Sequence, residues 1–86
     1  GVYAVDVELG QRSFKGMMNI GNRPTFNGTN RVIEVNIFDF DEDIYENELT
    51  IRLRKYIRAE RKFEGLEMLK SQLGKDKEIA QLYNPL

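Results

Sequence analysis

The feature that most constrains the fold is an unbroken β-type run at residues 31–40, RVIEVNIFDF. β-Branched and aromatic residues dominate this run, and no Gly or Pro interrupts it, which predicts one β-strand. Successive side chains in a strand point to opposite faces. One predicted face carries Ile33, Val35 and Ile37. The other face is mixed and carries Val32, Glu34, Asn36 and Phe38.

Glu34 is the first candidate for chemistry because of its position on the mixed face. If that face packs inward, the carboxylate lies between Val32 and Phe38, loses its hydration and becomes a stronger general base. The alternative is a face that meets solvent, with Glu34 as an ordinary surface charge, which is the commoner situation for glutamate. The alternation alone leaves both interpretations open.

The residue types that the chain lacks narrow its chemistry. There is no Cys and no His among the 86 residues, which excludes a disulfide scaffold, thiolate metal ligands and the commonest general base. The net charge of −1 gives no global attraction to nucleic acid or to an anionic membrane, and no run approaches the roughly 18 apolar residues of a membrane span. We therefore expect one small, soluble, cytoplasmic domain without nucleic-acid or membrane partners. Because the chain begins at Gly1 and not at Met, we also expect a fragment of a longer protein.

Three further strands are predicted by the same alternation, at residues 1–9, 12–20 and 49–53. Only Gly10 and Gln11 separate the first two, which is the spacing of a hairpin. Residues 19–30, NIGNRPTFNGTN, are dense in Gly, Asn, Thr and Pro and are predicted to form a loop. Such a loop is either a plain connection or a source of backbone N–H groups and small side chains for a ligand.

Two charged stretches follow the central strand. Residues 41–48, DEDIYENE, lack the spaced pattern of a calcium loop, which favours a solvated turn. Residues 52–62, RLRKYIRAERK, place six basic side chains against a single acid, Glu60. With Tyr56 inside this basic segment and Phe63 after it, the segment could bind phosphate, stack on a planar ring or hold single-stranded RNA. The alternative is a solvated strand end whose charge balances the acidic turn.

The apolar period changes to that of a helix at Phe63. A first helix is predicted to end at Gly74, and a second, short helix is predicted from Asp76, as N-cap or first-turn acid, to Tyr83. The residues expected to stop the second helix are Asn84 and Pro85. Both helices are expected to cover an open side of the sheet.

Strands within residues 1–54 followed by a helical tail at residues 63–83 predict a single, mainly β domain. The strands are expected to form an antiparallel sheet or barrel, with the helical tail as its cap.

Four segments of the chain resemble the riboflavin kinase module, which in bacteria is the C-terminal half of a bifunctional riboflavin kinase and FMN adenylyltransferase. They are GVYAV at residues 1–5, NIGNRPTF at 19–26, IEVNIFDFDEDIY at 33–45 and YIRAERKFEGLEML at 56–69. The resemblance covers nearly the whole chain in the family's order. It implies a six-stranded antiparallel Greek-key β-barrel with C-terminal helices, here partial, and ATP-dependent phosphorylation of riboflavin to FMN.

The resemblance also implies roles for individual residues. The family's catalytic base, the Glu of an E-x-H/N strand motif, falls on Glu34, and Asn36 stands where the family often has His. The flavin-contacting segment falls on Arg58, Arg61 and Phe63, types that can stack against or hydrogen-bond a flat isoalloxazine. The residues expected to line the nucleotide side are Asn22, Pro24 and Thr25.

The family binds Mg²⁺ and ATP through a P-T-x-N motif that normally lies upstream of the GVYA strand. Residues 24–27 spell the same pattern, but their flanks match a different family element, so we expect no metal site in this chain. Glu46 stands where the family often has Gly, so the turn there is expected to differ in shape. The expected result is a truncated module that cannot phosphorylate riboflavin alone and whose exposed strand edges can pair with another copy.

Two other classes of function fit the same residues. The first is an OB-like module that binds single-stranded RNA through residues 52–63, with an affinity that falls steeply with salt. The second is a structural domain that only dimerises a larger enzyme.

Overall fold

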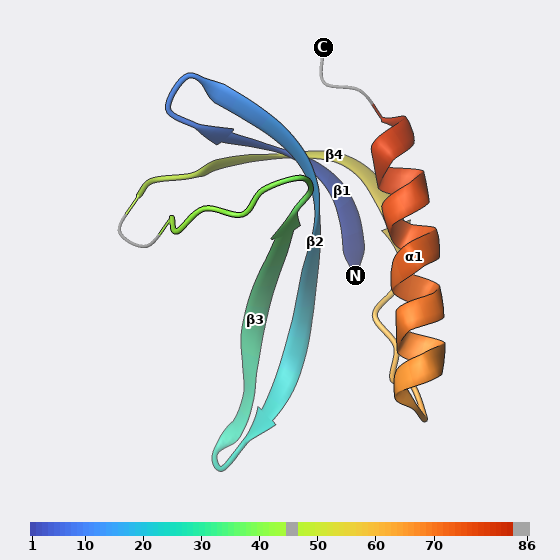
Figure 1. Cartoon of the computed structure of the whole chain (residues 1–86). Helices are drawn as coiled ribbons and strands as arrows, with labels where there is room; N and C mark the ends of the chain where they lie inside the picture. The colour runs from blue at the N-terminus through green and yellow to red at the C-terminus, as the bar shows by residue number, and fades with distance from the viewer. Residues whose placement is uncertain (45–46, 84–86) are drawn as a thin grey trace.

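The computed structural model describes residues 1–44 and 47–83, and within them the chain forms one antiparallel sheet and one helix (Figure 1). The strands are β1 (Val2–Leu9), β2 (Arg12–Thr25), β3 (Gly28–Ile37) and β4 (Thr50–Arg58), and the helix is α1 (Leu66–Leu82). The order in the sheet is β3-β2-β1-β4. The last strand, β4, therefore pairs with the first strand, β1, on the side opposite β2. The expectation of a mainly β, antiparallel fold is confirmed.

The hairpin between β1 and β2 forms at the predicted place. Leu9 pairs with Arg12 across a two-residue turn, and Gly10 in that turn has a φ of 61°. This left-handed conformation costs glycine little and other residues more.

The predicted loop at residues 19–30 is wrong, because most of it is paired strand. β2 continues to Thr25, which pairs with Gly28 of β3 across another two-residue turn. β1 begins with Val2 opposite Asn19, and Gly1 before it exchanges backbone hydrogen bonds with Ile20, so beyond Ile20 β3 is the only strand paired with β2. Pro24, which has no N–H to donate, is tolerated on this unpaired side. The composition resembled a loop, but it also suits a two-stranded hairpin that projects from the sheet (Figure 1).

The ends of β3 and β4 also differ from the predicted ones. β3 begins at Gly28 and ends at Ile37, two residues before Asp39, whose φ of 56° breaks the extended backbone. Phe38 therefore lies just outside the strand, and its side chain is buried. β4 continues to Arg58, so residues 52–58, more than half of the basic segment, lie in the sheet.

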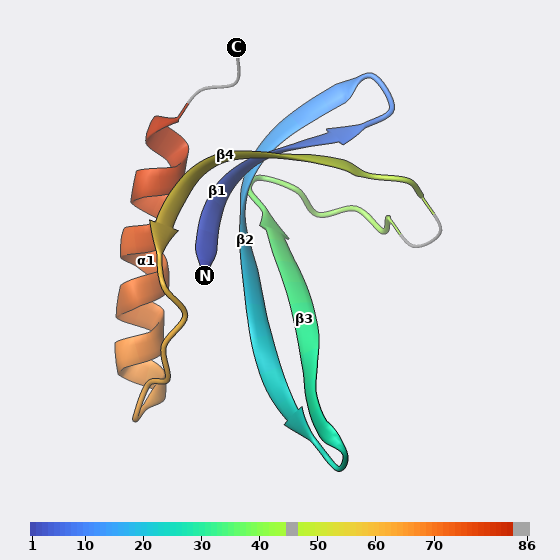
Figure 2. The ribbon, with the colours of Figure 1, turned by 180° about the vertical axis from the view of Figure 1, so that it is seen from behind.

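The two faces of the sheet have separate apolar clusters. On the helix-covered face, Ala4, Met17 and Phe38 pack with Ala80 of α1. The opposite face, called here the open face, has a cluster of Val5, Val7 and Met18 with partly buried neighbours (Tyr3, Phe14, Ile20, Val35, Ile37, Leu49 and Ile51). Figure 2 shows that α1 lies on one side of the sheet only. Several large side chains of the open face stay more than half exposed: Ile33, Leu53 and Tyr56.

The helical tail is one helix and not the two that were predicted. α1 passes through Gly74, and Asp76 is not an N-cap but a fully buried mid-helix residue. Glycine inside a helix costs about 1 kcal/mol, which the packing of Ala80 and the ion pair of Asp76 offset.

Within residues 1–44 and 47–83, no helix is long and apolar enough to cross a membrane. The expectations for Glu46, Asn84 and Pro85 lie outside the described residues.

Candidate functional site

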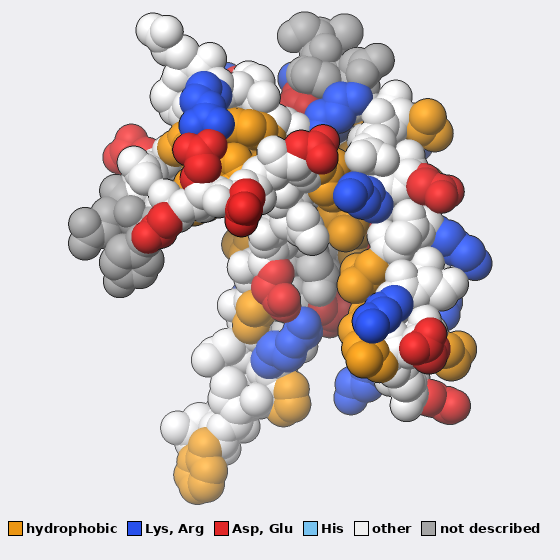
Figure 3. Space-filling view, viewed as in Figure 1, with side chains coloured by type: hydrophobic (Ala, Val, Ile, Leu, Met, Phe, Trp, Pro, Cys, Tyr) orange, Lys and Arg blue, Asp and Glu red, His pale blue; other side chains and the backbone are white. Residues whose placement is uncertain are grey.

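A cavity of about 800 Å³ lies between the β2–β3 hairpin, α1 and the connection from β4 to α1. Figure 3 shows the hollow between the hairpin and the helix. The apolar part of its wall includes Val2, Met17, Met18, Phe63, Leu69 and Leu73, and the polar part includes Asn19, Asn22, Arg23, Glu34, Glu60 and Arg61. A largely apolar pocket of this volume with a few convergent polar groups is typical of a small-molecule site.

Glu34 lies in this wall, and of the two interpretations left open by the alternation the solvent-exposed one holds. Its side chain is 60% exposed, and its Oε1 accepts a hydrogen bond from Arg23 Nη2 at 3.1 Å. The inward-packing interpretation is wrong because β3 is the edge strand of the sheet and α1 packs mainly against β1, β2 and β4. Glu34 nevertheless shares the cavity with Arg58 and Phe63, as the resemblance implied.

Glu60 and Arg23 form the centre of the polar wall, and the sequence analysis missed both. Oε2 of Glu60 accepts hydrogen bonds from Asn19 Nδ2 and Arg23 Nη1, each at 3.0 Å, and the carboxylate also accepts one from the Asn22 backbone. The bond from Arg23 is the main reason that the pKa of Glu60 lies below its ordinary value, and Glu60 in turn raises the pKa of Arg23. The available signal was that Glu60 is the single acid in a basic segment.

Gly21 explains how the Glu60 carboxylate comes so close to β2. A Cβ built on Gly21 would overlap the carboxylate oxygens of Glu60. Asn19, on the same strand, has a buried Oδ1 that finds no hydrogen-bond donor among the described residues. Such an acceptor costs about 1–3 kcal/mol when it stays unpaired, and a donor on a ligand in the cavity would satisfy it.

Arg58 is held in the wall by the helix. Its Nε and Nη2 donate to the buried Asp76 carboxylate at 2.8–3.0 Å, and Gln72 donates to the same carboxylate. The Arg58 charge is therefore already paired. Its guanidinium carbon also lies 5.7 Å from the centre of the Phe63 ring.

Phe63 and Arg61 are more available to a ligand. The guanidinium carbon of Arg61 lies 4.6 Å from the ring centre of Phe63, and both residues line the cavity. Arg61 forms no ion pair within residues 1–44 and 47–83. A planar cation stacked on an aromatic ring provides a surface on which a flat ligand can pack.

The residues expected on the nucleotide side are only partly brought to the cavity. Asn22 and Pro24 line it, whereas Thr25, at the end of β2, does not. Among the described residues, no group of three or more Asp, Glu, His or Cys side chains could hold a metal ion.

Half of the six basic side chains of the basic segment are paired with acids within the molecule. Arg52 pairs with Glu8, Arg54 with Asp6, and Arg58 with Asp76. Non-specific binding to nucleic acid depends on free cations that can replace phosphate counterions. These internal pairs leave less charge for the RNA-binding alternative than the sequence suggested.

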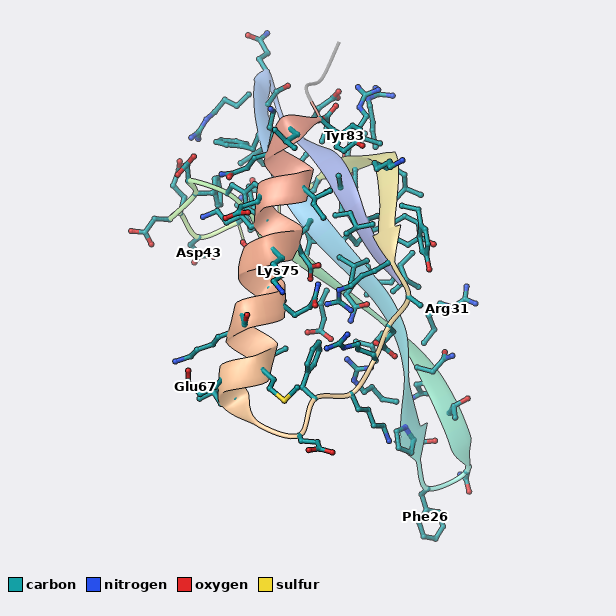
Figure 4. The ribbon with its side chains drawn as sticks, turned by 90° about the vertical axis from the view of Figure 1, so that its right-hand side faces the viewer. Phe26, Arg31, Asp43, Glu67, Lys75 and Tyr83 are labelled. Atoms are coloured by element: carbon teal, nitrogen blue, oxygen red, sulfur yellow. The ribbon has the colours of Figure 1, made fainter. Side chains whose placement is uncertain are left out.

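The model of the riboflavin kinase family, Flavokinase, matches residues 1–84. The chain belongs to the riboflavin kinase family. The expected family resemblance is thereby confirmed. Figure 4 shows the riboflavin kinase module from the side, with Phe26 at the tip of the hairpin and Glu67 at the start of α1.

Two curated relatives of this riboflavin kinase module are bifunctional riboflavin kinase/FMN adenylyltransferases. The protein of Bacillus subtilis (strain 168) is 43% identical over 86 residues, which cover 96% of this chain and 27% of that protein. The protein of Escherichia coli (strain K12) is 42% identical over 82 residues, which cover 94% of this chain and 26% of that protein. The module thus spans about a quarter of the length of these relatives.

A solved structure shares the fold of the riboflavin kinase module. It is a crystal structure from Streptococcus pneumoniae described as a macrolide-efflux protein, with a TM-score of 0.89 and 37% identity. The match covers 98% of this chain and 28% of that one. This likeness shows that the fold of the module recurs inside a longer chain.

Proposed function

We propose that this module is the kinase part of a longer bifunctional protein and that it transfers the γ-phosphoryl group of ATP to the 5′-hydroxyl of riboflavin. The observation that carries the proposal is the cavity in which Glu34 shares a wall with Arg61 and Phe63. The family and its bifunctional relatives support the reaction and its two substrates. The partners are then small molecules and not nucleic acid, and a cytoplasmic location follows from the supply of ATP.

In the proposed reaction Glu34 acts as the general base. One oxygen, Oε1, is held by Arg23, while Oε2 accepts no hydrogen bond from the described residues. Oε2 takes the proton of the riboflavin 5′-hydroxyl while the hydroxyl oxygen forms a bond to the γ-phosphorus. The bond from the γ-phosphorus to the bridging oxygen breaks, and ADP leaves with the electron pair.

The apolar wall and the pair of Phe63 and Arg61 are proposed to hold the isoalloxazine ring. Phe63 is partly buried and presents an aromatic surface, over which the Arg61 guanidinium lies. Arg58 is proposed to contribute through its position in the wall, since its charge is paired with Asp76.

Mg²⁺ is proposed to enter with ATP as part of that substrate. The described residues do not fit a metal site, because Glu34 and Glu60 both pair with Arg23 and no cluster of three acidic ligands exists among them. We propose that parts of the parent protein outside these residues bind MgATP. Asn22 and Pro24, which line the cavity, are proposed to face the nucleotide, and Thr25 follows them just outside it at the end of β2.

We also propose that the sheet is one part of a six-stranded Greek-key barrel in the parent protein. The order β3-β2-β1-β4, with the fourth strand beside the first, supports a Greek key. The exposed apolar side chains of the open face and the unpaired edges of β3 and β4 support closure by further strands. In the isolated module these edges would be free to pair with a second copy, and the lack of kinase activity in that form stays a prediction.

The proposal is tested with Glu34→Gln in the full-length parent protein, by following ATP-dependent FMN formation. Loss of a general base lowers kcat by about 10²- to 10⁴-fold, while the circular dichroism spectrum is expected to stay unchanged. Glu8→Gln is the matched control, because Glu8 is also a partly exposed strand carboxylate paired with an arginine, but lies outside the cavity. If Glu34→Gln retains the kcat of Glu8→Gln, Glu34 is not the base.

A further inference from the structure

We propose that Glu60 and Arg23 are positioning residues for Glu34: Glu60 anchors Arg23, and Arg23 fixes one oxygen of the Glu34 carboxylate. This inference rests on the proposed kinase reaction and adds two residues to it. Arg23 Nη1 donates to Glu60 Oε2 at 3.0 Å, and Arg23 Nη2 donates to Glu34 Oε1 at 3.1 Å. One guanidinium thus joins the connection before α1 to the strand that carries the base.

In the series of contacts from Glu60 through Arg23 to Glu34, the Glu60 carboxylate is the group held most firmly by its neighbours. Glu60 Oε2 accepts from Asn19 Nδ2 as well as from Arg23, and the carboxylate sits over Gly21, where any side chain would displace it. The exposed fraction of the side chains rises from 31% at Glu60 through 46% at Arg23 to 60% at Glu34. The least solvated carboxylate is therefore the anchor, and the most solvated one is the group that is held.

Arg23 differs from the other arginines that form ion pairs in the described part of the chain. Each of the others pairs with a single acidic side chain, as Arg12 does with Glu42 and Arg52 with Glu8. Arg23 alone bridges two carboxylates, and these lie 26 positions apart in the sequence. A planar guanidinium with donors in a fixed fork suits this task, whereas a lysine ammonium is a single point charge.

Positioning matters because Glu34 is an exposed side chain on the outer strand of the hairpin. Without Arg23, nothing among the described residues holds either carboxylate oxygen of Glu34. A misplacement of about 1 Å in a reacting group can lower a rate about a hundredfold. Because Arg23 and Glu60 would act on the hydroxyl only through Glu34, their loss should lower kcat and leave the KM for riboflavin nearly unchanged.

The experiment measures kcat and KM for FMN formation by the full-length parent protein and its variants Arg23→Gln, Arg23→Lys and Glu60→Gln. For Arg23→Gln, kcat is expected to fall about tenfold to a hundredfold, with the KM for riboflavin within about twofold of the wild type. Arg23→Lys should recover part of the loss, since one ammonium can hold only one carboxylate at a time. Arg12→Gln is the matched control, because it breaks an ion pair of similar exposure outside the cavity.

A double-mutant cycle separates positioning from a general loss of structure. In a Glu34→Gln background, Arg23→Gln is expected to cause no further fall in kcat, because its effect passes through the Glu34 carboxylate. An additional fall as large as in the wild-type background would overturn the inference, as would an Arg23→Gln variant with the kcat of Arg12→Gln. If Arg23→Gln fails to fold, Glu60→Gln provides the same cycle, because it keeps the shape of the anchor and removes its charge.

The outcomes distinguish this inference from the reaction on which it rests. A collapse of activity in Glu34→Gln without any effect of Arg23→Gln or Glu60→Gln rejects the positioning role alone. Full activity in Glu34→Gln rejects the proposed base, and the positioning role is rejected with it.

Discussion

Glu34 shows what strand alternation can and cannot reveal about a single residue. The alternation correctly placed Glu34 on the same face as Asn36, which lines the same cavity. It could not reveal that β3 is the edge strand and that α1 packs mainly against β1, β2 and β4, which leaves the Glu34 side chain exposed. Burial of a strand residue depends on which elements cover its face, and that cover is a property of the whole fold.

Gly21 provides a test at the scale of one residue. In Gly21→Ala the new methyl group would overlap the Glu60 carboxylate, which is the flexible end of a side chain and can move aside. We expect the melting temperature to change little and kcat for FMN formation to fall about tenfold, because the anchor of Arg23 is displaced. Enzyme kinetics and thermal unfolding of the full-length protein check both parts.

Gly74→Ala is the control for this substitution. Gly74 lies in α1 outside the cavity, and a Cβ there meets no atom within 4 Å. If the two alanine variants have the same kcat, the Glu60 carboxylate has no influence on the reaction.

At the scale of the elements, the sequence predicted the four strands of the sheet, but it made β2 and β4 too short and placed β3 three residues too far along the chain. Residues 19–30 have a loop-like composition, yet their pairing with β3 satisfies the backbone groups that a loop would leave to water. The helical tail was divided at Gly74 because glycine is common just after a helix, whereas here Asp76 and Ala80 pack against the sheet and keep the helix continuous. Tertiary contacts outweighed local preference in both elements.

Some residues of the candidate site could be predicted from the sequence, and others could be recognised only in the structure. Glu34, Arg61 and Phe63 were found through segments whose local pattern carries the family resemblance. Arg23 and Glu60 also lie in such segments, but no role was predicted for either, because their pairing joins residues 37 positions apart. Only the arrangement of the hairpin against the connection before α1 brings them together.

The continuous helix predicts opposite effects of alanine at two glycines. Gly74→Ala should raise the free energy of unfolding by about 0.5–1 kcal/mol, because alanine in a helix interior loses less backbone entropy than glycine. Gly10→Ala should lower it, since the φ of 61° at Gly10 is strained for alanine although no atom lies within 4 Å of its Cβ either. Urea denaturation measures both variants, and a helix that ended at Gly74 would instead be destabilised by alanine there.

At the scale of the whole molecule, exposed ion pairs connect elements that are distant in the sequence. The carboxylates of Glu8, Glu42 and Glu60 each accept hydrogen bonds from an arginine, and these bonds are the main cause that lowers each pKa below the ordinary value of 4.5. A carboxylate with a lowered pKa in the folded state stabilises the fold fully above its pKa in the unfolded state. That stabilisation is lost as the pH falls through the lower, folded-state pKa.

We therefore expect the stability of the module to decrease as the pH falls below 4.5. Urea midpoints measured across this pH range check the expectation. A variant in which Glu8, Glu42 and Glu60 are all replaced by Gln should show a smaller decrease, because its side chains at these positions no longer titrate. An equal decrease in the two proteins would assign the acid sensitivity to other groups.

The hairpin of β2 and β3 extends past the end of β1, and its tip carries Phe26, whose side chain is fully exposed (Figure 4). Glu34 and Arg23 move with this arm, whereas Phe63 belongs to the segment that leads into α1. The two walls of the cavity are thus attached to different parts of the molecule. A small tilt of the hairpin relative to the rest of the sheet would change the width of the cavity entrance. A molecule bound at the hairpin tip would therefore change the distance between the Glu34 carboxylate and the Phe63 ring.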